Sequence, residues 1–413
     1  MQVSTVDRAR IPASPSGSEG PDRTHAATWA LLALAIGAFG IGVTEFSPMG
    51  MLPVIAEGVG VSIPAAGLLV SAYALGVTLG APVMTLLFAR FGKRTALIAL
   101  MAIFTLGNLM SALAPGYWTL LLSRMVTSVN HGAFFGLGAV VAARVVPKKR
   151  QASAVAAMFM GLTIANIGGV PVATWVGQTI GWRAAFVGTA VLGLLTIAAL
   201  RLALPAGGTA ERPEVWRELR VLVRPEVLVA LLTTILGASA MFAFYTYVAP
   251  ILETVTDASG AFVTAALMLI GLGFTFGNWL GGRLADWSLD GATAIFLGAL
   301  AVILLVAPWT LGTPAGAAVT LFAWGTAAFG IVPPVQMRVM QAAAEAPGLA
   351  SSVNVGAFNL GNAIGAALGG AVIGAGLGYA AVPIIGSLTA TAGLVLVWLG
   401  RRRQAPPAVA CGA

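Results

Sequence analysis

The chain has 413 residues, of which 58% are hydrophobic and 9% are charged, and its mean hydropathy is +0.93. Soluble domains carry roughly a quarter charged residues, so this composition excludes an ordinary soluble protein. The net charge of +8 comes from Lys and Arg in short loops between apolar segments, which excludes a nucleic-acid binder because no basic face forms. One cysteine and two histidines leave little for a disulfide frame or metal site, and we expect no metal and no cofactor.

Twelve apolar segments are long enough to cross the bilayer as helices, which takes about 20 residues each. In chain order they are residues 28–50, 64–88, 95–114, 118–144, 152–178, 183–203, 226–252, 262–284, 292–311, 315–340, 349–374 and 379–400. The sequence lacks the short segments of alternating polarity that are typical of membrane β-barrels. The predicted fold class is therefore an all-α integral membrane protein with twelve transmembrane helices.

Residues 1–27 are rich in Ser, Pro and charge, and we expect a disordered cytoplasmic tail rather than a cleaved secretory signal. The short loops on one side of the predicted spans hold nearly all the Lys and Arg, as in 90–94 and 144–150. Such loops stay in the cytoplasm, so both termini are predicted to be cytoplasmic.

The longest internal hydrophilic segment, 204–225, separates two sets of six predicted spans. A shift of 197 residues aligns prolines and glycines of one half with those of the other, namely Pro53 with Pro250, Gly76 with Gly273, Gly80 with Gly277 and Gly168 with Gly365. We therefore expect an N-terminal six-helix bundle over 28–203, a cytoplasmic linker over 204–225, a C-terminal six-helix bundle over 226–400 and a cytoplasmic tail over 401–413. Two such repeats are typical of transporters, with the substrate path between them.

Glu45 is the only carboxylate deep inside a predicted span, and Arg124 is the only comparably placed basic residue. Ionisable groups in the membrane are costly and usually serve transport or proton movement. Either the two form a static ion pair between spans one and four, or Glu45 alternately binds a proton and a cationic group of a substrate. His131, two helical turns from Arg124, is either a packing residue or a further proton carrier or substrate ligand. The predicted proton-coupling residues are thus Glu45, Arg124 and His131.

Amides and aromatic residues inside the spans are the remaining candidates for a substrate cavity, although intramembrane amides also serve to join helices. The predicted cavity residues are Asn130, Phe134, Asn166, Phe242, Tyr245, Tyr247, Gln336, Asn354 and Asn359. The second half has no acid equivalent to Glu45. We therefore expect the N-terminal half to handle charge.

Five stretches resemble the major facilitator superfamily, and within it the bacterial 12-span drug:proton antiporters of the arabinose-efflux-permease-like branch. They are GVTEFSPMGMLP at 42–53, NHGAFFGLG at 130–138, GLTIANIGGVP at 161–171, VPPVQMRVM at 332–340 and SSVNVGAFNLGN at 351–362. The resemblance implies a monomer in the bacterial inner membrane that exports a small drug or sugar-like metabolite against protons by alternating access. Facilitated uniport and proton symport remain alternatives, whereas a membrane-embedded enzyme or a sensor is disfavoured.

The family's loop signature between spans two and three is only partly present, because Thr85 replaces its first glycine and Ala89 its aspartate. In the family this aspartate latches the outward-facing state. The second-half copy keeps the glycine and the aspartate, Gly282 and Asp286. Together with glycines of close helix packing and the span-five antiporter motif, the predicted conformational-switch residues are Gly80, Arg90, Gly92, Lys93, Arg94, Gly168, Gly169, Pro171, Gly277, Gly282 and Asp286.

Overall fold

The computed structural model describes residues 21–61, 63–206 and 215–404, and these ranges consist of helices joined by short turns and loops, without strands. The first helices are α1 (Pro21–Gly50), α2 (Leu52–Val59), α3 (Ile63–Phe88), α4 (Lys93–Ala112), α5 (Tyr117–Arg144), α6 (Gln151–Ile164), α7 (Val170–Val176) and α8 (Trp182–Ala203). The later ones are α9 (Val215–Leu222), α10 (Pro225–Tyr245), α11 (Val248–Val255), α12 (Gly260–Trp287), α13 (Leu289–Thr310), α14 (Pro314–Gly330), α15 (Val332–Ala342), α16 (Pro347–Gly374) and α17 (Val382–Gln404). Short 3-10 or π segments are η1 (Lys148–Arg150), η2 (Ala165–Gly169), η3 (Gly177–Gly181) and η4 (Tyr379–Ala381).

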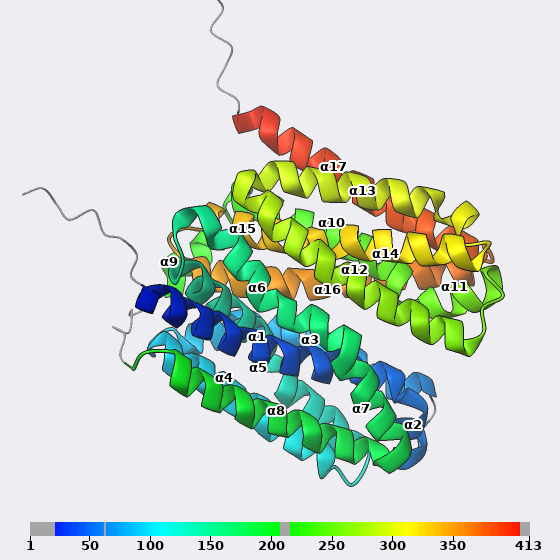
Figure 1. Ribbon diagram of the computed structural model, residues 1–413, viewed down its shortest axis with the longest axis horizontal. Helices are drawn as coiled ribbons and strands as arrows, with labels where there is room; N and C mark the ends of the chain where they lie inside the picture. Colours follow the sequence, from blue (N-terminus) through cyan, green and yellow to red (C-terminus); the bar gives the residue numbers. More distant parts are fainter. Residues whose placement is uncertain (1–20, 62, 207–214, 405–413) are drawn as a thin grey trace, which may run out of the picture.

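The helices run side by side, with the start of α1, α9 and the end of α17 gathered at one end and α2, α7 and α11 at the other (Figure 1). The blue-to-green helices α1–α8 pack on one another, chiefly α3 on α5, α4 on α8 and α1 on α6. The helices from α10 onward pack likewise, chiefly α12 on α14, α10 on α16 and α13 on α17. The two groups meet where α6 lies on α12 and where α16 lies on α3 and α5.

Eleven helices in the described ranges are long and apolar enough to cross a membrane. One of them, Lys148–Ala203, is 56 residues long and includes the predicted spans 152–178 and 183–203. At about 1.5 Å per residue it is far longer than a hydrocarbon core of about 30 Å. Gly181, with φ +125°, interrupts it just before α8 in a conformation that only glycine adopts easily.

The predicted span 226–252 is wrong at its end, because α10 stops at Tyr245 and α11 begins at Val248. Pro250 explains the break, since a proline has no N–H to bond to the carbonyl four residues back, which is that of Thr246. Pro53 has the same effect between α1 and α2. At the other end of α1 the helix begins at Pro21, within the predicted tail 1–27, of which residues 1–20 lie outside the described residues.

Glycines let neighbouring helices approach closely. A Cβ atom on Gly80 of α3 would lie 2.6 Å from the Cα atom of Val129 in α5, and one on Gly277 of α12 would collide with the main-chain oxygen of Thr326 in α14. Interfaces built on such small residues are common between membrane helices, where close backbone contact replaces the hydrophobic driving force.

Candidate substrate cavity and buried polar cluster

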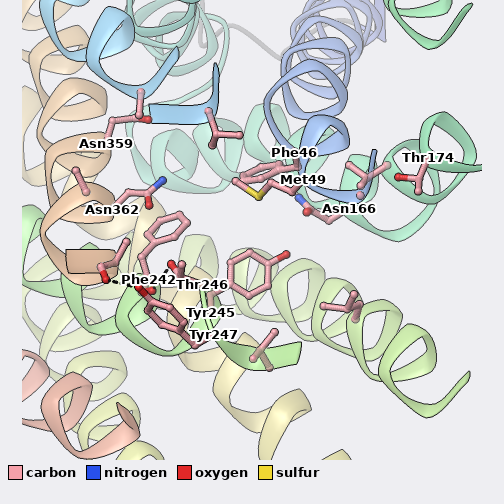
Figure 2. Close-up of a pocket in the computed structure, with 18 of the residues that line it drawn as sticks. Phe46, Met49, Asn166, Thr174, Phe242, Tyr245, Thr246, Tyr247, Asn359 and Asn362 are labelled. Atoms are coloured by element: carbon pink, nitrogen blue, oxygen red, sulfur yellow. Dashed lines mark hydrogen bonds between the residues drawn. The ribbon is translucent and has the colours of Figure 1, made fainter. Parts of the chain in front are cut away.

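A cavity of about 1100 Å³ lies between the two groups of helices (Figure 2). Its wall includes Met49 near the end of α1, Trp175 in α7, Tyr247 after α10 and Leu267 in the first third of α12. All four lie toward the end of the molecule that carries α2, α7 and α11. The cavity is therefore formed in that half of the molecule, away from the start of α1 and the end of α17.

Aromatic rings and amides face each other across this cavity. Phe46 comes from α1 and Asn166 from the π-helix η2, while Phe242 and Tyr245 come from α10 and Asn359 from α16 (Figure 2). Of the predicted cavity residues, Asn166, Phe242, Tyr245, Tyr247 and Asn359 line it. Asn362 also lines it, although it was not among the predicted cavity residues. An apolar wall with a few polar groups is typical of small-molecule sites.

A second cavity, of about 40 Å³, lies deeper and shares Phe46 and Asn359 with the first. On one side Glu45 and His131 line it, and on the other Gln336 and Asn354 do. The structure thus brings residues from both predicted classes, proton coupling and cavity lining, to one small space between the two helix groups.

Arg124 is 1% exposed and bonds to the main chain of α1 rather than to Glu45. Its guanidinium donates to the carbonyl oxygen of Thr44 at 2.8 Å and to Thr44 Oγ1 at 3.2 Å. Thr44 Oγ1 in turn donates to Asn108 Oδ1 at 2.6 Å. Among the described residues no Lys, Arg or His nitrogen lies within 4 Å of a Glu45 carboxylate oxygen. The structure thus contains Arg124 and Glu45 as near neighbours, without the static ion pair that was one of two expectations.

Tyr73 of α3 connects Arg124 to His131, and the sequence analysis missed it. The Arg124 guanidinium lies 4.4 Å from the centre of the Tyr73 ring, and the Tyr73 hydroxyl lies 3.2 Å from His131 Nδ1. The available signal was modest: Tyr73 is one of five tyrosines and occupies an otherwise apolar predicted span. A cation over an aromatic face is stabilising when both are desolvated.

Gln336 and Asn354 belong to a chain of buried hydrogen bonds on the opposite side of the small cavity. Thr234 Oγ1 donates to Asn354 Oδ1 at 2.6 Å, Asn354 Nδ2 donates to Gln336 Oε1 at 2.5 Å, and Gln336 Nε2 donates to Ser351 Oγ. These bonds join α10, α15 and α16. Because a satisfied polar network is rigid, this wall has a fixed geometry.

Two predicted cavity residues face elsewhere. Asn130 and Phe134 of α5 are fully buried and line neither cavity. Phe134 packs against Gly37 of α1, where a Cβ atom would collide with its ring. Their direction follows from helical periodicity, since Asn130 and Phe134 are one turn apart on a face that His131 does not share.

The span-five motif lies in and beside a π-helix. Gly168 and Gly169 belong to η2, and the N–H of Val170 bonds to the carbonyl of Ala165, five residues back. Pro171 follows and has no N–H to donate, which favours a wider turn at this point. Gly169 packs tightly on Val43, whereas a Cβ atom on Gly168 would meet open space, so close packing does not explain that glycine.

At the end that carries the start of α1 and the end of α17, polar contacts close the two helix groups on each other. Asp286 of α12 accepts from the main-chain N–H groups of Ala152, at 2.9 Å, and Ser153, and from the Ser153 hydroxyl. Gly282 leaves room for this approach, because a Cβ atom there would press on Ala156. Near Ala89, which replaces the family aspartate, Thr85 Oγ1 donates to Ser352 Oγ at 2.6 Å.

The predicted basic cluster lies at the same end. Arg94 donates to the main-chain oxygen of Arg201 at 2.7 Å, which joins α4 to α8. Arg90 is exposed, Gly92 precedes the first turn of α4, and Lys93 begins that helix. Arg94 therefore holds two helices of the first group together, whereas Asp286 and Thr85 connect the two groups.

The chain is similar to known membrane transporters in sequence and in fold. Residues 34–356 match the family described as Major Facilitator Superfamily. The chain is 64% identical over 374 residues to the inner membrane transport protein YdhP of Escherichia coli (strain K12), covering 91% of this chain and 96% of that protein. It is 31% identical over 344 residues to the chloramphenicol resistance protein of Streptomyces lividans, covering 81% and 86%. The structure of the proton:xylose symporter XylE bound to 6-bromo-6-deoxy-D-glucose is similar in fold, with a TM-score of 0.74, 16% identity and coverage of 91% and 96%.

Proposed function

The chain is a member of the major facilitator superfamily, and on that premise we propose that it is a secondary active exporter that exchanges protons for a small amphipathic drug or sugar-like metabolite. It is a transporter and not an enzyme. The proposal covers the direction of transport, the coupling to protons and the class of substrate.

In the membrane the chain makes twelve crossings as two six-helix bundles, with both termini in the cytoplasm. The 56-residue segment Lys148–Ala203 supplies two of the crossings, on either side of Gly181. The Lys and Arg bias of the loops supports this orientation in a bacterial inner membrane. One chain contains the whole cavity, which supports a functional monomer.

The observation that carries the proposal is a cavity between two helix groups that are closed on each other at the other end. The cavity lies away from the start of α1 and the end of α17, while Asp286 and Thr85 make contacts between the groups at the end that carries these helix ends. Transporters built from two repeats place the substrate at the repeat interface and expose it to each side in turn. The arrangement corresponds to an outward-facing state.

Glu45 is the proposed proton carrier. It lines the small cavity beneath the large one, and Arg124 holds the adjacent main chain without pairing with the carboxylate. An intramembrane acid with no fixed partner is available to exchange a proton. His131 and Tyr73 form the hydrogen-bonded wall next to it.

Glu45→Gln tests this function in proteoliposomes, with radiolabelled chloramphenicol as the probe. We expect the variant to lose accumulation driven by a pH gradient but to keep exchange of labelled for unlabelled probe, because exchange needs no net proton movement. Glu57→Gln, in α2 and exposed, is the matched control and should behave as the wild type. Gradient-driven accumulation by Glu45→Gln at the wild-type rate would exclude Glu45 as the carrier, whereas no gradient-driven accumulation by the wild type would favour uniport.

A further inference from the structure

We infer that the substrate of this transporter is uncharged, and that it and the proton occupy separate compartments: the large cavity takes a neutral amphipathic molecule, and the small cavity takes only the proton. This inference rests on the proposed function and adds the charge class of the substrate. It contradicts the alternative in which Glu45 binds a cationic group of the substrate.

The large cavity has no charged wall. Among the described residues that line it there is no Asp, Glu, Lys, Arg or His. Its polar groups are amides, the hydroxyls of Thr and Tyr and the indole of Trp175, which offer hydrogen bonds but no counter-ion; the amides are Asn166, Gln178, Asn359 and Asn362. Moving an ion out of water without a counter-ion is costly, whereas hydroxyl and amide groups of a neutral molecule find partners here.

Glu45, the nearest acid, is out of reach of a drug-sized cation. The cavity that it lines measures about 40 Å³. On this measure one water needs about 10–15 Å³, so the space suits a few waters or a hydrated proton and not a drug-sized molecule. Phe46 and Asn359 line both cavities and so form the partition between them.

The aromatic residues do not form an open cage for a cation. Tyr245 packs against Phe274 and Trp324 with ring centres 5.6 and 5.7 Å away. Phe242 packs edge to face on Phe358 at 5.6 Å. Phe242 and Tyr245 are thus engaged with other rings and offer apolar contact to a substrate rather than two free faces around a positive charge.

The positive charge of Arg124 also disfavours a cationic substrate. Once Glu45 carries a proton, the nearby buried charge is that of Arg124, which is 1% exposed and bonded to Thr44. A positive group at this depth repels a cationic substrate and leaves a neutral one unaffected. Because the inferred substrate is uncharged, its exchange for a proton moves net charge across the membrane in every cycle.

Asn362→Asp tests the inference by adding the missing counter-ion to the wall of the large cavity. The probe is tetraphenylphosphonium, a permanent organic cation, and its affinity for the purified full-length protein is measured by isothermal titration calorimetry. We expect Asn362→Asp to bind the cation measurably, and the wild type to bind it at least ten-fold more weakly or not at all. Asn362→Leu, similar in size and uncharged, is the matched control and should bind the cation no better than the wild type.

The inference is overturned if the wild type binds the cation as tightly as Asn362→Asp, or if the aspartate brings no gain. Transport distinguishes this failure from failure of the proposed function. If proteoliposomes accumulate tetraphenylphosphonium in response to a pH gradient and Glu45→Gln abolishes this, the protein is a proton-coupled exporter and the neutral-substrate inference alone is wrong. A charge movement with chloramphenicol, recorded on a supported membrane, supports the inference.

Discussion

Arg124 donates a 2.8 Å hydrogen bond to the main-chain carbonyl of Thr44, the residue that precedes Glu45 in α1. The guanidinium therefore positions the backbone next to the acid while the carboxylate itself keeps no ionic partner among the described residues. In helices a threonine hydroxyl commonly bonds back to its own helix, but Thr44 uses its hydroxyl between Arg124 and Asn108. Three helices thus meet at one side chain, directly beside Glu45.

Removing Arg124 should cost far more stability than removing the Thr44 hydroxyl. We expect Arg124→Ala to lower the free energy of unfolding by about 3 kcal/mol, because it leaves buried acceptors unpaired and removes the cation from Tyr73. Thr44→Val keeps the carbonyl acceptor and should cost about 1 kcal/mol. Thermal unfolding of both variants in detergent measures the difference, and equal losses would show that the hydroxyl, not the carbonyl, carries the contact.

Tyr73 makes two contacts, and two substitutions separate them. Tyr73→Phe keeps the ring beside Arg124 and removes the hydroxyl from His131, so we expect a loss of about 1 kcal/mol. Tyr73→Leu also removes the aromatic face and should cost about 1 kcal/mol more. Chemical unfolding monitored by tryptophan fluorescence checks the order. A Phe variant less stable than the Leu variant would contradict the importance of the ring.

Two glycines should respond in opposite ways to the same added methyl group. Gly277→Ala forces a Cβ atom onto the Thr326 carbonyl, and we expect a loss of about 1–3 kcal/mol from overpacking. Gly188→Ala is the matched control, since it lies in α8 with nothing within 4 Å and gains helix propensity of up to about 1 kcal/mol. The melting temperatures of the two variants measure the difference. Equal shifts would exclude close contact with the Thr326 backbone as the reason that position 277 requires glycine.

Asp286→Asn should loosen the closed end of the molecule. The amide keeps one acceptor but loses the charge that strengthens the bonds to the start of α6, so we expect a larger separation of the two groups at that end. Spin labels at the exposed positions Leu202 and Trp287 report that distance by double electron–electron resonance. The sole cysteine is first replaced as Cys411→Ser.

Ser153→Ala is the control for this experiment. It removes a hydroxyl donor to Asp286 and leaves both main-chain donors in place, so a smaller change in the distance distribution is expected. A distribution unchanged in Asp286→Asn would mean that the hydroxyl pair of Thr85 and Ser352 holds the end closed without the carboxylate.

Most of the fold could be predicted from the lengths of the apolar segments, because a helix must have a minimum apolar length to cross the bilayer. The repeat pattern even contains the breaks after α1 and α10, since Pro53 and Pro250 correspond under the shift of 197 residues. The predicted span 28–50 ends where α1 ends, whereas the predicted span 226–252 ran through the break after α10, because prolines are common inside membrane helices, where neighbouring groups satisfy the freed carbonyls.

The cavity could be predicted only in part, for a geometric reason. Residue type identifies candidates such as Asn166 and Tyr245, but rotation of each helix decides which of them face the cavity. Asn130 and His131 are adjacent in sequence, and only His131 lines a cavity. Tyr73 and the free carboxylate of Glu45 depend on side-chain directions across three helices, which the sequence pattern does not contain.

The π-helix at Ala165–Gly169 holds one residue more than an α-helical turn would. Each residue turns a helix by about 100°, so everything beyond it is rotated by that amount relative to an uninterrupted helix. Thr174 lies beyond it in α7 and lines the large cavity. On this side, the wall depends on the bulge as well as on the residue types: if η2 straightened into an α-helical turn at the same chain length, a different set of side chains would face the substrate without any of them being substituted.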